Sequence, residues 1–361
     1  MIATPQESDG TAVKTTQFRI ADGPARARAA RARLFVLAGA AGLLGCGGGT
    51  KATQNAEAAA LVTSGQPGVL SSAAFLDDGS AVIAGGQIGG GGALLFRWDG
   101  RTLAPLPAQG AHAFWWVSAR AANDVWLAGE AGEVHRFDGA TLTAVDAGVP
   151  ASATLFGVFS PADGEAWAVG GSFSSGGAKR IIRHLAAGQW SPVDSPADVP
   201  VETTYFKVWG ASAADVWIVG DGGVVLHWNG TTLEHQAGVG GAERFLTVHG
   251  CDAQNVWIVG GTVTSELRAF DGQAWRTVAV PQAQPLAGVA CAAGDVIVGG
   301  AFGYAARLSG GGTVARTILT PTEVADLTIH AVARSGGHTL LVGGDVLATA
   351  GAPFRGFVLQ L

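Results

Sequence analysis

The chain is poor in the side chains that most enzymes and metal centres use. Its 361 residues include three Cys, two Tyr and eight His, and only 14% are charged. HExxH, GxSxG and Walker phosphate-loop motifs are missing, as is the DxDxDG pattern of a calcium loop. The two Cys after residue 46 come without CxxC or clustered His, which argues against zinc. We therefore expect no catalytic residue, no metal and no cofactor.

Long helical periodicity is also missing after residue 60, and a short motif repeats there instead. The motif is an acidic residue or Asn, a small apolar residue, Trp, two apolar residues and Gly. Four copies with Trp span residues 124–129, 165–170, 215–220 and 255–260, and three copies without Trp end at Gly85, Gly299 and Gly343. The steps from Gly to Gly are 44, 41, 50, 40, 39 and 44 residues. Seven copies at this spacing indicate a repeat architecture.

Each repeat holds four short apolar runs separated by turn residues. Short runs rich in Val, Ile, Trp, Phe and Thr are typical of strands. Asp-Gly or Asn-Gly pairs end at Gly100, Gly139, Gly230 and Gly272, and each predicts a tight hairpin with positive φ at both residues. Four antiparallel strands in each of seven repeats predict an all-β, seven-bladed β-propeller. A seven-stranded sandwich would need only about 100 residues.

The two ends of the repeat region are expected to meet. The seventh repeat stops at residues 357–361, which match a third strand, and an unassigned apolar run, residues 58–63, precedes the first repeat. We expect this N-terminal run to complete the last blade as its fourth strand, because an exposed strand edge would remain otherwise.

The Trp residues of the motif recur at one position in each repeat. Trp126, Trp167, Trp217 and Trp257 could form a carbohydrate-stacking set, but their periodic placement favours packing between neighbouring sheets.

Residues 1–45 differ from the rest of the chain. Four Arg between residues 26 and 33 precede an eleven-residue apolar run, residues 34–44, which is shorter than the roughly 20 residues of a membrane span. A basic region, a short apolar core and a small residue before the cut make a secretory signal. Residues 43–46, Leu-Leu-Gly-Cys, resemble the lipobox of bacterial lipoproteins. The resemblance implies that Cys46 carries diacylglycerol and begins the mature chain; the alternative is an ordinary Cys after a chance apolar run.

The same resemblance implies a location. Gly47, and not Asp, follows the lipidated Cys, which by analogy with enteric sorting points to the outer membrane. We expect residues 46–56 to form a flexible tether and residues 57–361 to form the propeller. Residues 1–45 hold six Lys/Arg and three Asp/Glu, so the mature chain has 16 basic and 25 acidic residues and a formal charge of −9. This balance makes nucleic acid a poor partner.

Cys251 and Cys291 each lie four residues before the Asn or Asp that opens a second strand. Both therefore fall in the same turn of neighbouring blades. An exported compartment permits a disulfide between them if the Cα atoms lie within about 7 Å. Two free buried thiols are the alternative.

The repeats resemble the kelch repeat, which has an apolar run, a double Gly, an aromatic residue and a Trp on the outer strand. The double Gly at 170–171 followed by Trp190, and that at 260–261 followed by Trp275, match best. The resemblance covers residues 70–361 and implies a kelch-like or neuraminidase-like propeller.

Two enzyme families with such propellers differ from this chain at their functional residues. Galactose-oxidase-like enzymes need a Tyr/His copper site with a Cys–Tyr crosslink, and the placement of Tyr205 and Tyr304 suggests no shared centre. Sialidases need SxDxGxTW boxes, and residues 160–164 are out of register for one. A carbohydrate-active hydrolase or lyase at the channel mouth stays as the alternative function, and it requires a convergent pair of carboxylates.

A binding site is expected on one face of the propeller. Connections from second to third strands, and from fourth strands to the next blade, share that face and surround the channel. An aromatic group with charged residues around it suits a protein or glycan ligand. The candidate residues on that face are His112, Trp116, Glu130, Phe173, Asp221, Glu243, Arg244, Phe302 and Tyr304.

Two neighbouring Trp in this set have different expected roles. Trp115 occupies the repeat position of Phe156, Phe206 and Leu246, which indicates packing. Trp116 occupies the position of Gly157, Lys207 and Thr247, so the repeat does not require its size. Trp116 is therefore the strongest single candidate for binding.

These observations together favour a binding or envelope-assembly module. The expected partners are the membrane, through the lipid on Cys46, and an envelope protein or glycan. A purely structural envelope protein is a third alternative.

Overall fold

The computed structural model describes residues 57–241, 243–280, 284–309, 312–346 and 354–361. The predicted signal segment 1–45, the predicted lipidation site Cys46 and the predicted tether 46–56 lie outside the described residues. Within the described ranges, no helix combines the length and the hydrophobicity that a membrane span requires.

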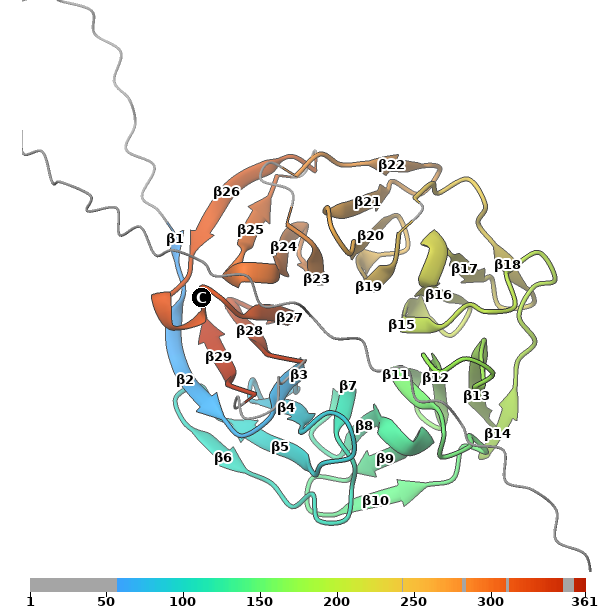
Figure 1. Cartoon of the computed structure of the whole chain (residues 1–361), viewed down its shortest axis with the longest axis horizontal. Helices are drawn as coiled ribbons and strands as arrows, with labels where there is room; N and C mark the ends of the chain where they lie inside the picture. The colour runs from blue at the N-terminus through green and yellow to red at the C-terminus, as the bar shows by residue number, and fades with distance from the viewer. Residues whose placement is uncertain (1–56, 242, 281–283, 310–311, 347–353) are drawn as a thin grey trace, which may run out of the picture. The chain divides into compact units, whose positions relative to one another are not determined.

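The described residues form seven β-sheets around a common centre (Figure 1), which confirms the predicted seven-bladed propeller. The first strand of each blade is the innermost. The first strands are β3 (Val69–Phe75), β7 (Phe114–Ala121), β11 (Thr154–Ala162), β15 (Tyr205–Ser212), β19 (Phe245–Asp252), β23 (Leu286–Ala292) and β27 (Thr328–Ser335). The second strands are β4 (Ala81–Gly86), β8 (Asp124–Gly129), β12 (Glu165–Gly171), β16 (Asp215–Gly220), β20 (Asn255–Gly260), β24 (Asp295–Gly300) and β28 (His338–Gly344).

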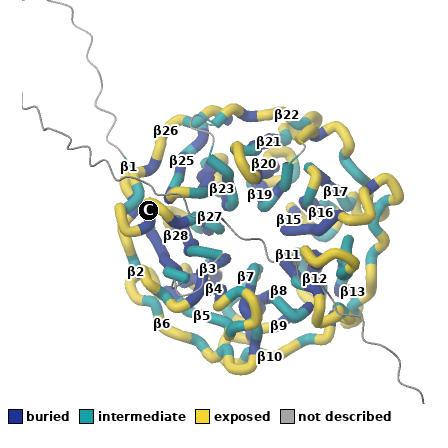
Figure 2. The backbone as a smooth tube through the Cα atoms, viewed as in Figure 1, coloured by how far each residue is buried: buried dark blue, intermediate teal, exposed yellow. Residues whose placement is uncertain are grey.

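The third and fourth strands lie progressively farther out, and Figure 2 shows the outermost strands largely exposed. The third strands are β5 (Ala93–Trp98), β9 (Val134–Phe137), β13 (Ile181–Ala186), β17 (Val225–Trp228), β21 (Glu266–Phe270), β25 (Ala305–Leu308) and β29 (Gly356–Gln360). The fourth strands are β6 (Leu103–Pro105), β10 (Leu142–Val145), β14 (Gln189–Pro192), β18 (Leu233–His235), β22 (Trp275–Thr277), β26 (Val314–Leu319) and β2 (Ala60–Gln66).

Short 3₁₀ turns occur in four of the connections. Three of them join second to third strands, and the fourth precedes β27. They are η1 (Glu130–Gly132), η2 (Asp221–Gly223), η3 (Ala301–Gly303) and η4 (Thr322–Val324).

The N-terminal strand completes the last blade, as predicted. β2 pairs antiparallel with β29, with Leu61 opposite Leu359, and the sheet order is β2-β29-β28-β27. The strand begins at Ala60 and ends at Gln66, slightly later than the apolar run 58–63. The ring is therefore closed by strands from both ends of the repeat region, and β2 covers the edge that β29 would otherwise expose.

A second contact of the N-terminal segment was not predicted. The two-residue strand β1 (Glu57–Ala58) pairs in parallel with β26 of the sixth blade, which becomes five-stranded. The Glu57 carboxylate accepts a hydrogen bond of 2.9 Å from Nε of Arg307. The guanidinium of Arg307 also contacts Asp295. The segment that closes the seventh blade is thus also tied to the sixth.

The repeated motif has a structural explanation. Its Trp side chains are almost fully buried in the apolar clusters between blades, as their spacing predicted. The acidic residue that opens the motif faces a basic residue of the third strand: Asp215 Oδ1 lies 2.6 Å from His227 Nε2. The ring of His227 in turn stacks on Trp217 at 3.9 Å between centroids. The motif therefore combines packing between blades with a polar contact to the third strand in the four copies that open at Asp124, Glu165, Asp215 and Asp295.

The Asp-Gly hairpins differ from the prediction. In the β5–β6 connection, Gly100 has a positive φ of 98° but Asp99 does not. Trp98 pairs with Leu103, so the loop has four residues. The reason is that Asp99 Oδ1 accepts the N–H groups of Arg101 and Thr102 at 2.8 and 2.6 Å. The side chain thus closes the turn while its own backbone stays in an ordinary conformation.

Candidate functional site

Each innermost strand contains a β-bulge next to the Gly of the motif. In all seven blades the pairing of first and second strands skips one residue, for example Trp115 between Phe114 and Trp116. The seven skipped residues are Ser71, Trp115, Phe156, Phe206, Leu246, Ala287 and His330. A bulge changes the direction of the side chain it carries and is common next to functional sites.

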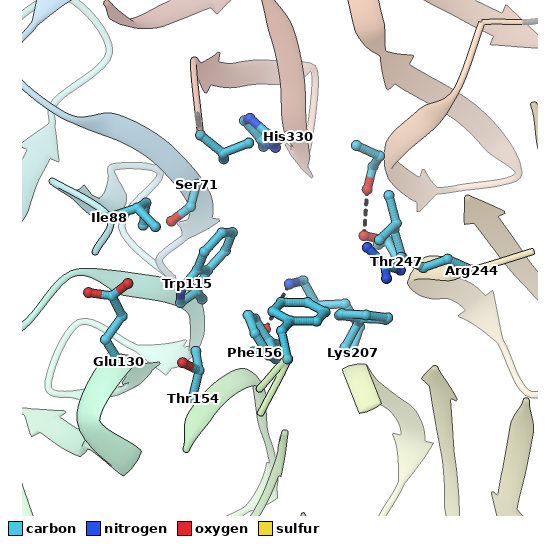
Figure 3. Close-up of a pocket in the computed structure, with 15 residues that line it drawn as sticks. Ser71, Ile88, Trp115, Glu130, Thr154, Phe156, Lys207, Arg244, Thr247 and His330 are labelled. Carbon is cyan, nitrogen blue, oxygen red and sulfur yellow. Dashed lines mark hydrogen bonds between the residues drawn. The ribbon is translucent and has the colours of Figure 1, made fainter. Parts of the chain in front are cut away.

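All seven bulge residues line one cavity of about 470 Å³ (Figure 3). Residues from second-to-third connections, such as Ile88, Glu130 and Phe173, line it as well. The cavity therefore lies at the end of the channel that carries those connections, and we call this side of the ring the mouth face. Its volume is within the range of small-ligand pockets, about 300–1,000 Å³.

The cavity wall is asymmetric. Four consecutive blades contribute large apolar side chains: Trp115, Phe156, Phe206 and Leu246. The Phe156 ring lies 5.2 Å from Trp115 and 5.5 Å from Phe206 between centroids. The other three blades contribute the smaller or polar bulge residues. One side of the cavity thus suits an apolar group, and the opposite side leaves room for the rest of a ligand.

Lys207 is the buried cation of this wall. It follows the bulge residue of β15, and its Nζ donates a hydrogen bond of 2.7 Å to the Phe156 carbonyl. The same Nζ lies 4.4 Å from the ring centroid of Trp116, within cation–π range. Desolvation lowers the pKa of Lys207 to about 7. No carboxylate of the described residues lies within salt-bridge distance of this amine.

The other charged residues of the cavity already have partners. Nε of Arg244 donates to Asp221 Oδ1 at 2.7 Å, and its guanidinium covers the rings of Phe173 and Phe206. The Glu130 carboxylate accepts the backbone N–H groups of Gly89 and Gly90 at 2.8 and 3.1 Å. Glu130 is the one carboxylate among the described cavity residues.

His330 contributes a neutral imidazole. Its Nε2 donates to the Gly344 carbonyl at 3.1 Å, which leaves Nδ1 as an acceptor. Desolvation lowers the pKa of His330 to about 4, and the nearby charge of Lys207 acts in the same direction. The ring is therefore uncharged near neutral pH.

The structure brings only some of the sequence candidates together. Glu130, Phe173 and Arg244 line the cavity, and Asp221 pairs with Arg244. His112 instead pairs with Glu133 at 2.7 Å, outside the cavity lining.

The remaining candidates of the mouth face lie away from the cavity wall. Glu243 accepts Thr262 Oγ1 at 2.8 Å. Phe302 is exposed, and Tyr304 packs against the apolar cluster between the fifth and sixth blades.

The two neighbouring Trp occupy different surroundings. Trp115 lines the cavity, and its Nε1 has no hydrogen-bond partner among the described residues. Trp116 packs against two of the clusters between blades and lies under the Lys207 amine. Its contact with the cavity is therefore made through Lys207.

Sequence reasoning did not select the bulge residues as a set. Trp115, Phe156, Phe206 and Leu246 were aligned with one another, but an apolar residue at a repeated position is usually a packing residue. The available signal was the break in that pattern, since Ser71 and His330 occupy the same position in the first and last blades.

The structure joins Cys251 and Cys291 in a disulfide, with their Cα atoms 4.9 Å apart. The bond links β19 of the fifth blade to β23 of the sixth. The pair lies outside the cavity lining and belongs to the apolar cluster between these two blades. Among the described residues, no group of three or more His, Cys, Asp and Glu could hold a metal ion.

No protein-family model matches the sequence, and no curated protein matches it. Solved structures match in fold. The WD40 repeats of RRP9 have a TM-score of 0.62 at 11% identity, over 85% of this chain and 99% of that chain. The WD40 propeller domain of Doa1 has a TM-score of 0.60 at 11% identity, over 83% and 96%. YCF48 bound to D1 peptide has a TM-score of 0.50 at 15% identity, over 64% and 74%. At these identities the similarity shows the propeller fold alone.

Proposed function

We propose that this protein is an exported, lipid-anchored propeller that binds a polypeptide partner at the mouth of its channel. The observation that carries the proposal is the set of seven bulges, which direct one side chain from every blade into a single cavity. Packing alone does not require such a set, because an unbulged strand would keep these side chains between the blades.

The surface around the cavity supports a polypeptide partner. Six large apolar side chains are exposed among the described residues, and four of them lie on connections of the mouth face. These are Phe173, Val201, Val263 and Phe302, with exposed fractions of 59%, 65%, 77% and 64%. Phe173 also lines the cavity, so exposed apolar surface continues from the cavity onto this face, which is typical of protein-binding surfaces.

A structural neighbour gives independent support. YCF48, which resembles this chain in fold, is bound to a D1 peptide. A propeller of this shape therefore accommodates a peptide in at least one other protein. The further step to this chain is our proposal.

The location rests on the N-terminal pattern. Residues 26–46 combine a basic region, a short apolar run and a lipobox-like end, and diacylglycerol on Cys46 would supply the anchor. We also propose that the repeats are of a degenerate kelch type, because their double Gly precedes the third strand where kelch units carry it.

The carbohydrate-active alternative lacks a comparable supporting observation. A glycoside hydrolase needs two carboxylates on either side of the reacting bond. Glu130 stands alone among the cavity residues that the structure describes, and it accepts two backbone N–H groups.

Photo-crosslinking in the native cell envelope tests the proposed function. A photoreactive amino acid replaces Phe302 on the mouth face of the full chain, and in a matched control it replaces Ala140, which is exposed on the opposite face. We expect position 302, and not position 140, to give a crosslink that protease treatment removes. A crosslinked glycan, equal products from both positions, or no product from position 302 would contradict the proposal.

The anchor has a separate test. Cells expressing the full chain are fed an alkyne fatty acid, and labelled protein is detected after purification. We expect label on the wild-type chain and none on Cys46→Ser. Equal labelling of the two would contradict lipidation at Cys46 without affecting the proposed binding site.

A further inference from the structure

We propose that the cavity binds a carboxylate of a polypeptide, either its C-terminus or an acidic side chain, next to an apolar residue, and that Lys207 pairs with this carboxylate. This inference rests on the proposed function and names the chemistry that the mouth would recognise.

Lys207 has unfilled hydrogen-bonding capacity. An ammonium group has three N–H donors, and the described residues supply one acceptor, the Phe156 carbonyl. The residue is 8% exposed, so water replaces little of the missing contact. Burying a cation without a counter-charge is unfavourable. A ligand anion in the cavity would remove this cost.

The neighbouring blade holds the Lys207 side chain at the cavity. Gly157 of the neighbouring blade approaches the Lys207 backbone so closely that a Cβ there would lie 2.9 Å from its Cα. The missing side chain leaves room for the Lys207 side chain to cross the third blade toward Trp116. The amine is therefore fixed in the cavity wall and does not extend into solvent.

Other polar groups of the wall are already hydrogen-bonded within the protein. Arg244 and Glu130 have partners, as described above, and Ser71 and Thr247 donate their hydroxyl protons to the carbonyls of Phe114 and Ala287 at 2.7 and 2.6 Å. Lys207 is thus the cavity cation whose charge is still available. A phosphate usually collects several cations or Arg forks, whereas one ammonium suits one carboxylate.

The Lys207 amine lies next to aromatic side chains. Lys207 follows Phe206 and contacts the Phe156 carbonyl, so the aromatic half of the cavity begins beside it. A carboxylate on Lys207 would place an adjacent apolar side chain against these rings. The apolar mouth face favours a polypeptide over an acidic sugar as the source of that carboxylate.

A tetrapeptide library tests the inference with the full-length protein in detergent. The library varies the last two residues, and each member is made with a free C-terminal carboxylate and as an amide. We expect the free acids that end in apolar residues to bind about ten- to a hundredfold more tightly than their amides, which is typical of a charged hydrogen bond. Amides with Asp or Glu beside an apolar residue would identify an acidic side chain as the source instead.

Two lysine variants test whether Lys207 causes the preference for free acids over amides. Lys207→Met should reduce the affinity of the acids to that of the amides. Lys179→Met is the matched control, because Lys179 is the other lysine of the described residues and lies on the same face outside the cavity lining. It should leave the preference unchanged. If Lys207→Met does not fold, wild-type protein can be treated with formaldehyde and borohydride, and the bound acids should slow methylation of Lys207 but not of Lys179.

The outcomes separate this inference from the proposed function. Equal affinity for acids and amides would overturn the role of the carboxylate and leave peptide binding intact. A preference for acids that survives Lys207→Met would overturn the role of Lys207. Binding of an acidic oligosaccharide and of no peptide would overturn the polypeptide source of the carboxylate. Failure of every library member to bind would overturn this inference, and the crosslinking experiment would still test the proposed function separately.

Discussion

The Lys207 amine lies 4.4 Å from the ring centroid of Trp116, although the two residues belong to blades that are not neighbours. The third blade separates them, and its innermost strand carries Gly157 at the corresponding position. The contact therefore requires a residue without a side chain between them. The position of the Lys207 charge in the cavity wall therefore depends on how the second, third and fourth blades pack together.

Gly157→Ala should destabilise the protein. The new Cβ would lie 2.9 Å from Lys207 Cα and from the Phe206 carbonyl oxygen, so two strands would have to separate. Overpacking of this kind costs about 1–3 kcal/mol, and thermal unfolding measures it. Gly337→Ala is the control, because a Cβ there meets nothing within 4 Å. Equal melting temperatures for the two variants would contradict the close approach.

Lys207→Met should stabilise the free protein near pH 6. The folded-state pKa of Lys207 is about 7 against 10.5 for an ordinary lysine. The unfolded chain therefore binds more protons between these values, and stability rises with pH across that window. Below pH 7 the buried charge should cost on the order of a few kcal/mol. The advantage of the Met variant should shrink from pH 7 to pH 10, and a constant difference in melting temperature would count against a buried ammonium.

Acid should destabilise the protein partly through His249. Its Nδ1 accepts the Cys291 N–H at 3.3 Å, its ring stacks on Trp209, and desolvation lowers its pKa to about 4 from an ordinary 6.5. Because the unfolded state binds the proton more readily, this stability is complete above pH 6.5 and is lost as the pH falls toward 4.

Denaturant unfolding at pH 7, 5 and 4 tests the role of His249. His249→Gln should lose less stability on acidification than the wild type, by up to about 3 kcal/mol. His330 titrates in the same window, so part of the acid sensitivity should remain. Identical pH profiles would refute the assignment to His249.

Reduction of the disulfide should weaken the ring without affecting binding. Cys251 and Cys291 are 40 residues apart in sequence, and closing such a loop is expected to contribute up to roughly 4 kcal/mol. Cys251→Ser should lower the free energy of unfolding by up to the same amount, which appears as a lower denaturant midpoint. The midpoint of this variant should not change when dithiothreitol is added. A midpoint in the wild type that reductant leaves unchanged would contradict this.

Much of the fold could be predicted from sequence because each blade repeats the same short pattern. The spacing of the motif Gly residues predicted seven blades. The seventh repeat contains only three strands, and the unassigned apolar run before the first repeat was available as its fourth strand. The pairing of β1 with the sixth blade could not be predicted, because two residues carry no recognisable strand pattern. The four-residue hairpin at Asp99 was missed because the same Asp-Gly pair also occurs in two-residue turns.

Less of the candidate site could be predicted, for a geometric reason. A bulge moves one residue out of register, and in a strand a shift of one position changes the side chain's face. Trp115 therefore lines the cavity and Trp116 packs between blades, although their alignments suggested the reverse roles. The buried amine of Lys207 was equally hidden, since its burial depends on Gly157 of a different repeat.

The crosslinking yield from position 302 in a Trp115→Ala background tests whether the bulge residues form the binding surface. Trp115 belongs to the bulge ring, whereas Trp190 lies on the fourth strand of the third blade, and Trp190→Ala serves as the control. If the bulge residues form the binding surface, Trp115→Ala should reduce the polypeptide crosslink at least about tenfold while Trp190→Ala preserves it. An unchanged yield with Trp115→Ala, in protein that melts like the wild type, would show that the partner does not bind at the bulge residues.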